Sequence, residues 1–265
     1  MKKLHVFSLL CLVNISSAAI TRTWDNGGGD QLWNNAVNWS QNLTPTIADN
    51  ANIRLAQGAI INDSMAAQAL QILIGGESPS GSSYITMNGG TLDVGEGLMV
   101  GYNLNTRGTG ILNMNGGTIT TGITTAASGD MWVGSKLAGT TSTLNMTNGT
   151  INVSDTLGIS EYSGVVGIIN LSGGTIIAAD FRMNNAGGAA GKLEISGTGK
   201  LVINGDVTTL INTYINNGWI TASGGATIQR DYNITNSGKT TIWVPEPATL
   251  CLLGLGIPCL IRRKK

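Results

Sequence analysis

The sequence predicts an all-β fold, a right-handed parallel β-helix in which the chain winds as a solenoid. Three observations support this fold class: a glycine-rich motif recurs about every 25 residues, a second apolar element recurs between its copies, and residues 80–205 show no helical periodicity. Repeats of this length are typical of solenoids, in which each unit stacks on its neighbours. The alternatives are a β-sandwich and a β-propeller, whose blades need about 40 residues, more than the interval in this chain.

The glycine-rich motif reads Met-Asn-Gly-Gly-Thr-Leu in its first copy, over residues 87–92, and related copies begin at residues 114, 146, 171 and 195. Strands this short cannot bury a face alone, but stacked coils can. We therefore expect two internal ladders. The first ladder contains the leading residue of each copy: Met87, Met114, Met146, Leu171 and Ile195. The second ladder contains the apolar residue that follows the glycines: Leu92, Ile119, Ile151, Ile176 and Leu201.

The Asn-Gly-Gly steps predict corners, because glycine adopts positive φ at little cost and asparagine tolerates it. Asn88 and Asn115 occupy the same place in consecutive copies, so we expect their side chains to stack and share hydrogen bonds. The longest interval between copies, 32 residues from Met114 to Met146, contains an insertion over residues 120–130. We expect this insertion to form a loop on one corner of the coil.

The second apolar element has copies that begin at residues 72, 98, 131, 157 and 181. From the third residue of each copy, the next glycine-rich copy begins 12 to 14 residues further on. This nearly constant spacing predicts another strand in each coil, so that residues 47–205 form the β-helix repeats.

A solenoid needs caps over its open edge strands, and residues 20–46 are the candidate for the front end. They contain three closely spaced tryptophans: Trp24, Trp33 and Trp39. We interpret these indoles as a plug for the first coil, because large aromatic side chains contribute most to core burial. An exposed aromatic platform for sugar and a calcium site at Asp25 and Asp30 are the alternatives for this segment.

Residues 206–243 are the candidate for the back cap. Five apolar residues there follow helical spacing: Val207, Leu210, Ile211, Tyr214 and Ile215. Asp206 is a candidate N-cap, and Gly218 is a typical C-terminal stop. We expect a short amphipathic helix across the last coil, followed by one or two closing strands.

The first 19 residues have the three parts of a secretory signal peptide: two lysines, an apolar run and small residues at the end. Cleavage is expected after Ala18 or Ala19. An uncleaved membrane anchor is the alternative, but the apolar run is shorter than the roughly 20 residues that a transmembrane helix needs. The sequence therefore predicts an exported protein.

The composition of residues 20–243 excludes several kinds of chemistry. This body contains no cysteine and no histidine, which excludes a Ser-His-Asp triad, a cysteine nucleophile and the usual zinc sites. Its nine basic and 14 acidic residues give a charge of about −5, which does not favour nucleic acid. Asp93 and Glu96 are the only close acidic pair outside the caps. We expect no metal, no cofactor and no catalytic residue.

The last segment, residues 244–265, combines three features in order. A Val244-Pro245-Glu246-Pro247 motif precedes a short apolar stretch, and four cations end the chain: Arg262, Arg263, Lys264 and Lys265. The stretch predicts a marginal membrane-spanning helix, interrupted by Pro258, whose cations stay on the cytoplasmic side. We interpret the segment as a sorting signal that holds the tail in the membrane and presents the motif to a processing enzyme.

In these residues the chain resembles the bacterial PEP-CTERM proteins, the presumed substrates of exosortase. The Trp-Asp-Asn-Gly-Gly-Gly-Asp opening at residues 24–30 and the glycine-rich repeats also resemble the autotransporter-like β-helical bodies that are often joined to such tails. The resemblance implies export and exosortase as a partner. It also implies transient anchoring by the tail and a final place on the surface of a Gram-negative-type bacterium or in its extracellular polysaccharide.

For the body we expect a non-enzymatic structural or adhesive role. A β-helical polysaccharide lyase or hydrolase, or a glycan-binding protein, is the alternative. An enzyme of this kind would need carboxylates that converge on one face, whereas the acids here are scattered along the chain.

Overall fold

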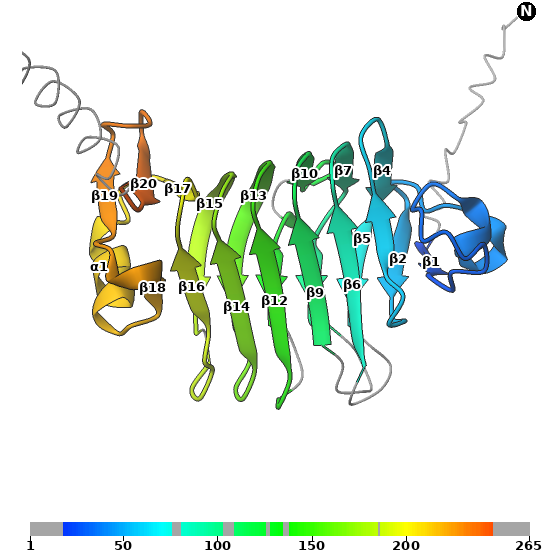
Figure 1. Cartoon of the computed structure of the whole chain (residues 1–265), viewed down its shortest axis with the longest axis horizontal. Coiled ribbons are helices and arrows are strands. Elements are labelled where there is room, and N and C mark those ends of the chain that lie inside the picture. Colours follow the sequence, from blue (N-terminus) through cyan, green and yellow to red (C-terminus); the bar gives the residue numbers. More distant parts are fainter. Residues whose placement is uncertain are drawn as a thin grey trace, which may run out of the picture.

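The computed structural model describes residues 18–75, 81–102, 109–125, 128–134, 138–184 and 186–245. These residues form a rod-shaped parallel β-solenoid, seen from the side in Figure 1. Its strands belong to two hydrogen-bonded sheets, one of 13 strands and one of seven. The β-solenoid expected from the repeats is confirmed.

The seven-stranded sheet forms the first face of the solenoid. All of its neighbouring strands pair in parallel. From front to back they are β3 (Ala59–Ile61), β6 (Ser82–Met87), β9 (Thr109–Met114), β12 (Thr141–Met146), β14 (Val166–Leu171), β16 (Lys192–Ile195) and β18 (Ile220–Ala222).

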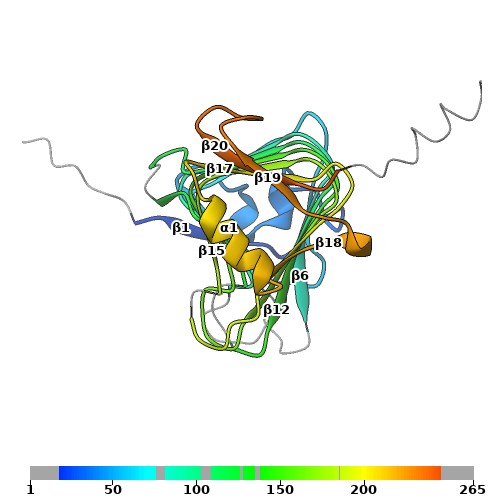
Figure 2. The same cartoon turned by 90° about the vertical axis from the view of Figure 1, so that its left-hand side faces the viewer.

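The 13-stranded sheet bends around two further faces. The second face begins with β4 (Ala66–Ala69), β7 (Thr91–Val94) and β10 (Thr118–Thr121). The third face begins with β1 (Ile20–Thr23), β2 (Asp49–Ile53), β5 (Gln71–Ile74), β8 (Leu98–Val100) and β11 (Met131–Val133). Two longer strands, β13 (Thr150–Ile159) and β15 (Thr175–Met183), run over both faces, with a register shift in their pairing. Figure 2 looks along the resulting tube.

Both internal ladders expected from the repeats are present. Met114 pairs in register with Met87 and Met146, and Ile119 pairs with Leu92 and Ile151. The later copies continue both series to Ile195 and Leu201, and every member of the two ladders is 0% exposed. The second apolar element aligns in the same way on the third face. The recurring apolar positions therefore form one continuous core.

The corners behave as the Asn-Gly-Gly steps predict. Gly117 has φ +81°, and a Cβ there would lie 2.6–2.7 Å from backbone atoms of the coil before it. The Asn115 side-chain amide donates to the Asn88 carbonyl oxygen at 3.0 Å, and Asn88 donates in turn to Asn62 at 2.9 Å. The expected stacking of asparagines is confirmed and extends one coil further forward.

The insertion over residues 120–130 lies at the corner between β10 and β11. The backbone amide of Thr124 donates to the carbonyl of Gly95 at 3.0 Å, and the Thr121 hydroxyl donates to the carbonyl of Gly129. Residues 126–127 lie outside the described residues. The position agrees with a loop attached to one corner of a regular coil.

The three front tryptophans are buried, with exposures of 2% or less. Trp39 contacts the other two edge to face, at centroid distances of 5.0 Å from Trp24 and 4.7 Å from Trp33. Beside them, Ile60 in β3 exchanges backbone hydrogen bonds with Gln31 and Trp33, which covers the front edge of the first face. Two short 3-10 helices, η1 (Ala36–Asn38) and η2 (Ser40–Asn42), complete the front cap. The segment plugs the first coil, as expected.

Parallel pairing extends beyond residues 47–205 at both ends. In front, β1 pairs with β2, so the ladder already begins at Ile20. At the back, β18 pairs with β16. Each of these strands adds to an existing edge by backbone pairing, although neither contains a recognisable copy of a repeat.

The back cap contains the expected helix, α1 (Thr208–Asn216), which buries Ile211 and Tyr214 and lies across the end of the coils (Figure 2). The expected N-cap needs a correction: Val207 occupies the cap position and Asp206 lies one residue earlier. The Asp206 carboxylate still accepts hydrogen bonds from the backbone amide and hydroxyl of Thr208, at 3.1 and 2.7 Å. These bonds lower the pKa of Asp206 below its usual value, the hydroxyl contributing most.

Two antiparallel strands close the solenoid at the back. The first, β20 (Lys239–Trp243), pairs with β17 (Lys200–Asn204). The second, β19 (Gln229–Tyr232), pairs with β20. A 3-10 helix, η4 (Ser223–Gly225), precedes both strands in the chain. The expectation of closing strands is confirmed. The change from parallel to antiparallel pairing ends the series of coils.

In the part of the chain that the structure describes, no helix has the length and apolar character needed to cross a membrane. The membrane-spanning helix expected after residue 247 lies outside the described residues.

Candidate functional site

The sorting motif begins where the folded body ends. Trp243 is the last residue of β20 and pairs in register with Lys200 of β17. Val244 is 8% exposed and packs against the core, whereas Pro245 is exposed. The motif therefore leaves the body between these two residues. Glu246, Pro247 and the cations from Arg262 to Lys265 lie outside the described residues.

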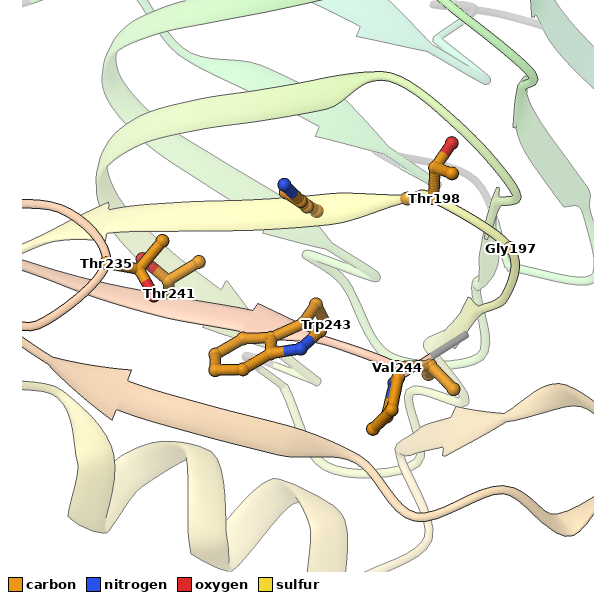
Figure 3. Close-up of a pocket in the computed structure, with 9 residues that line it drawn as sticks. Gly197, Thr198, Thr235, Thr241, Trp243 and Val244 are labelled. Atoms are coloured by element: carbon orange, nitrogen blue, oxygen red, sulfur yellow. The ribbon is translucent and has the colours of Figure 1, made fainter. Parts of the chain in front are cut away.

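A hollow of about 390 Å³ lies beside this exit (Figure 3). Its lining comes from the turn before β17, from β17, from the turn after β19 and from β20: Gly197, Thr198, Gly199, Lys200, Thr235, Thr241, Trp243, Val244 and Pro245. The side chains of Lys200 and Thr198 are exposed, and the Trp243 indole is half-buried. The hollow therefore combines a cation, hydroxyls and an aromatic ring next to the motif.

Hydrogen bonds hold the rim of the hollow in place. The Asp231 carboxylate accepts from the backbone amide and the hydroxyl of Thr235, at 3.0 and 2.6 Å. These bonds lower the pKa of Asp231 below its usual value, the hydroxyl contributing most. The Asn236 amide donates to the Thr241 hydroxyl at 2.9 Å. The turn between β19 and β20 is therefore shaped before any partner arrives.

A second hollow, of about 460 Å³, crosses the outer side of the third face near the front of the rod. We call it the front groove, and its lining residues are Thr21, Asn50, Asn52, Arg54, Gln71, Leu73, Met99 and Tyr102. Parallel register places Leu73 between Asn52 and Met99. The Asn50 side-chain oxygen is buried without a hydrogen-bond partner among the described residues. Amides beside an apolar strip and a tyrosine can bind a ligand that carries hydroxyl groups.

The two alternatives for the front cap meet structural objections. The three indoles are buried, so they present no exposed ring face to a sugar. The Asp30 carboxylate accepts from the side chains of Asn38 and Asn35 and from the backbone amide of Leu32. These hydrogen bonds, with the Asn38 bond contributing most, lower the pKa of Asp30 below its usual value. Asp25 accepts from the Gly27 amide at 3.0 Å, so both carboxylates serve the cap itself.

Two acidic side chains of the body, Glu96 and Asp180, interact with separate partners in the solenoid. Glu96 accepts a hydrogen bond from Gln71, whereas Asp93 lies on β7 in register with Thr120. Elsewhere, Asp180 forms an ion pair with Arg182 at 2.8 Å. Among the described residues, no three histidine, cysteine or acidic side chains come together in a group that could hold a metal ion.

The expected signal-cleavage residues lie directly in front of the first strand. Ala18 and Ala19 are exposed, and β1 begins at Ile20. Cleavage after either alanine would leave β1 complete. Residues 1–17 lie outside the described residues.

The linings of the two hollows did not stand out in the sequence. Lys200 and Trp243 meet only through the antiparallel register of β17 and β20. Asn50 and Asn52 alternate with the buried Ala51 and Ile53, which marks them as outward-facing, but the pattern does not single them out as binding residues.

Residues 244–265 match the family model of the PEP-CTERM protein-sorting motif. The match covers the tail alone, and the chain therefore carries a sorting signal of the kind that exosortase processes. Such a signal indicates an exported protein that is directed to the cell surface. Comparison of the chain with curated proteins and with solved structures gives no match.

Proposed function

We propose that this chain is an exported surface or extracellular-matrix protein whose tail is removed by exosortase, in a bacterium of Gram-negative type. We further propose that its solenoid is a non-enzymatic structural or adhesive body that associates with extracellular polysaccharide. The observation that carries the proposal is the position of the sorting motif, which directly follows the closing strand: Val244 is still buried, and Pro245 is the first exposed residue. Removal of the tail there would leave the body intact.

The expected mode of action starts at the membrane. The apolar stretch after Pro247 holds the chain there transiently, and the terminal cations keep its end on the cytoplasmic side. Pro245 and Pro247 disfavour helix and keep the motif extended, a form that a processing cleft can accept. Exosortase then cuts near the motif and releases the body.

The front groove supports an association with polysaccharide. Its amide side chains, Asn50 among them, can donate to and accept from sugar hydroxyls. The groove is lined by residues of β1, β2, β5 and β8 near the front of the rod, whereas Pro245 follows β20 at the back end, where β19 and β20 lie (Figure 1). A body held by its tail therefore presents the groove away from the membrane.

Processing can be tested in the native host. We expect the full chain to appear outside the cell in a shortened form, and to stay full-length in the membrane fraction when exosortase is deleted. A Glu246→Ala variant should show the same retention, and an Ala248→Val variant, next to the motif but outside it, should be processed normally. Shortening that persists without exosortase would refute this part of the proposal.

Polysaccharide association can be tested by co-sedimentation of the shortened protein with the host's extracellular polysaccharide. We expect Asn50→Ala to weaken binding and Asn152→Ala to leave it unchanged. Asn152 is a matched control because it is a half-buried asparagine on β13, in register with Thr120 and Ile177 on the second face. Loss of polymer viscosity on incubation would instead favour the lyase or hydrolase alternative.

A further inference from the structure

We infer that the processing enzyme docks against the folded back end of the solenoid, at the hollow beside the motif, and does not recognise the tail alone. This inference rests on the proposed function, because it concerns how exosortase would approach its substrate. It identifies a second recognition surface on the body itself, next to the start of the motif.

The first argument is the reach of the motif. Trp243 is hydrogen-bonded in β20 and Val244 is buried, so the accessible chain begins at Pro245. An extended residue spans at most about 3.6 Å, so residues 245–247 reach only about 11 Å from the body. Typical protease complexes involve about 20–30 residues on each side. An enzyme that encloses the motif must therefore touch the end of the rod.

The second argument is that the body cannot easily release more chain. All five residues of β20 pair with β17, and four of them also pair with β19. Within β20, Thr240, Thr241 and Ile242 are at most 1% exposed. Freeing this strand would expose the edge of β17 and the apolar Ile242 side chain. Because these losses accumulate, the end of the solenoid stays folded while the motif is read.

The third argument is the character of the surface around the exit. The hollow can accept one side chain of a partner, next to the half-buried Trp243 ring. Lys200 stands directly across from Trp243 and is exposed, so a carboxylate of the enzyme is the partner that its charge favours. The turn held by the hydrogen bond from Thr235 to Asp231 contributes Thr235 to the lining of the hollow. We therefore assign to the enzyme an acidic side chain that faces Lys200, beside an apolar one that enters the hollow.

The test compares charge reversals in the full chain, expressed in a host with exosortase. Lys200→Glu should slow the conversion of full-length to shortened protein by about tenfold, because like charges then oppose each other at the contact. Lys192→Glu is the matched control: it makes the same charge change on β16, at an exposed position outside the lining of the hollow. It should be processed at the wild-type rate. A second variant, Thr198→Trp, should also slow processing by obstructing the hollow, and thermal melting checks that each variant is folded.

A linker insertion separates docking from motif recognition. Six Gly/Ser residues between Trp243 and Val244 keep the motif at residues 244–247 whole and remove the constraint on reach, so the linked chain should tolerate Lys200→Glu without a further loss of rate. If folded Lys200→Glu and Thr198→Trp chains are processed at the wild-type rate, the docking surface is refuted and the proposed function stands. If the wild-type chain is not shortened, or is shortened without exosortase, the proposed function itself fails.

Discussion

Replacement of Met114 by aspartate tests the internal ladder at its centre. Met114 is 0% exposed and lies between Met87 and Met146 in consecutive coils. Truncating a buried methionine typically costs about 2–5 kcal/mol, and a buried, unpaired carboxylate costs more. We therefore expect Met114→Asp to lower the free energy of unfolding by at least ~4 kcal/mol. For a domain of 150–250 residues this corresponds to a fall in Tm of at least ~8 °C.

Two further variants make the comparison specific. Met114→Leu conserves volume and apolar character and should cost less than ~1.5 kcal/mol. Asn152→Asp places the same carboxylate at a half-buried, outward position on β13, in the other sheet, and should shift the free energy of unfolding by only about 0.5 kcal/mol. Thermal melting followed by circular dichroism, on protein without the signal peptide and the tail, gives the three values. Equal Tm values for Met114→Asp and Asn152→Asp would show that the inward face of the solenoid is wrongly assigned.

Three further predictions concern the caps and faces. Gly158→Val should destabilise the body, because a Cβ there would lie 2.0 Å from the Trp132 ring. A red shift of tryptophan fluorescence would report the displaced indole. An unchanged spectrum and an unchanged Tm would contradict this packing. Trp39→Ala should cost about 3–5 kcal/mol, measured by urea unfolding, and a cost below ~1 kcal/mol would show that the front cap does not depend on this indole. Asp30→Asn should lower Tm at neutral pH. Because the pKa of folded Asp30 is lowered, its stabilising effect is present above the unfolded pKa and lost as the pH falls through the folded value. The difference in Tm between wild type and variant should therefore shrink in acid, and a difference that does not change with pH would contradict the role of the carboxylate.

The core of the solenoid could be predicted because each core position recurs in several coils. Met87, Met114 and Met146 show the same residue type at nearly the same interval, and register in a parallel stack follows directly from that recurrence. The asparagine corner was predictable for the same reason. Asparagines at the same place in consecutive copies lie one above the other, so their side-chain amides can bond to each other.

Features made by single, unrepeated segments were harder to predict. The N-cap position of α1 was placed one residue early, because an aspartate can reach the Thr208 amide from the preceding position as well. The hollow at the tail exit depends on the register of β17 with β20, whose residues are far apart in the sequence. The front groove depends on three coils at once, and only the parallel register brings Asn52, Leu73 and Met99 into one row.

The most direct test of the whole account is the intact mass of this protein, isolated from outside cells of its native host. The account predicts a chain that begins at residue 19 or 20 and ends near Pro247, so that it lacks both the signal peptide and the apolar tail. A chain that still ends in Lys265 and occurs only in the membrane fraction would contradict it, and would make the tail a permanent anchor.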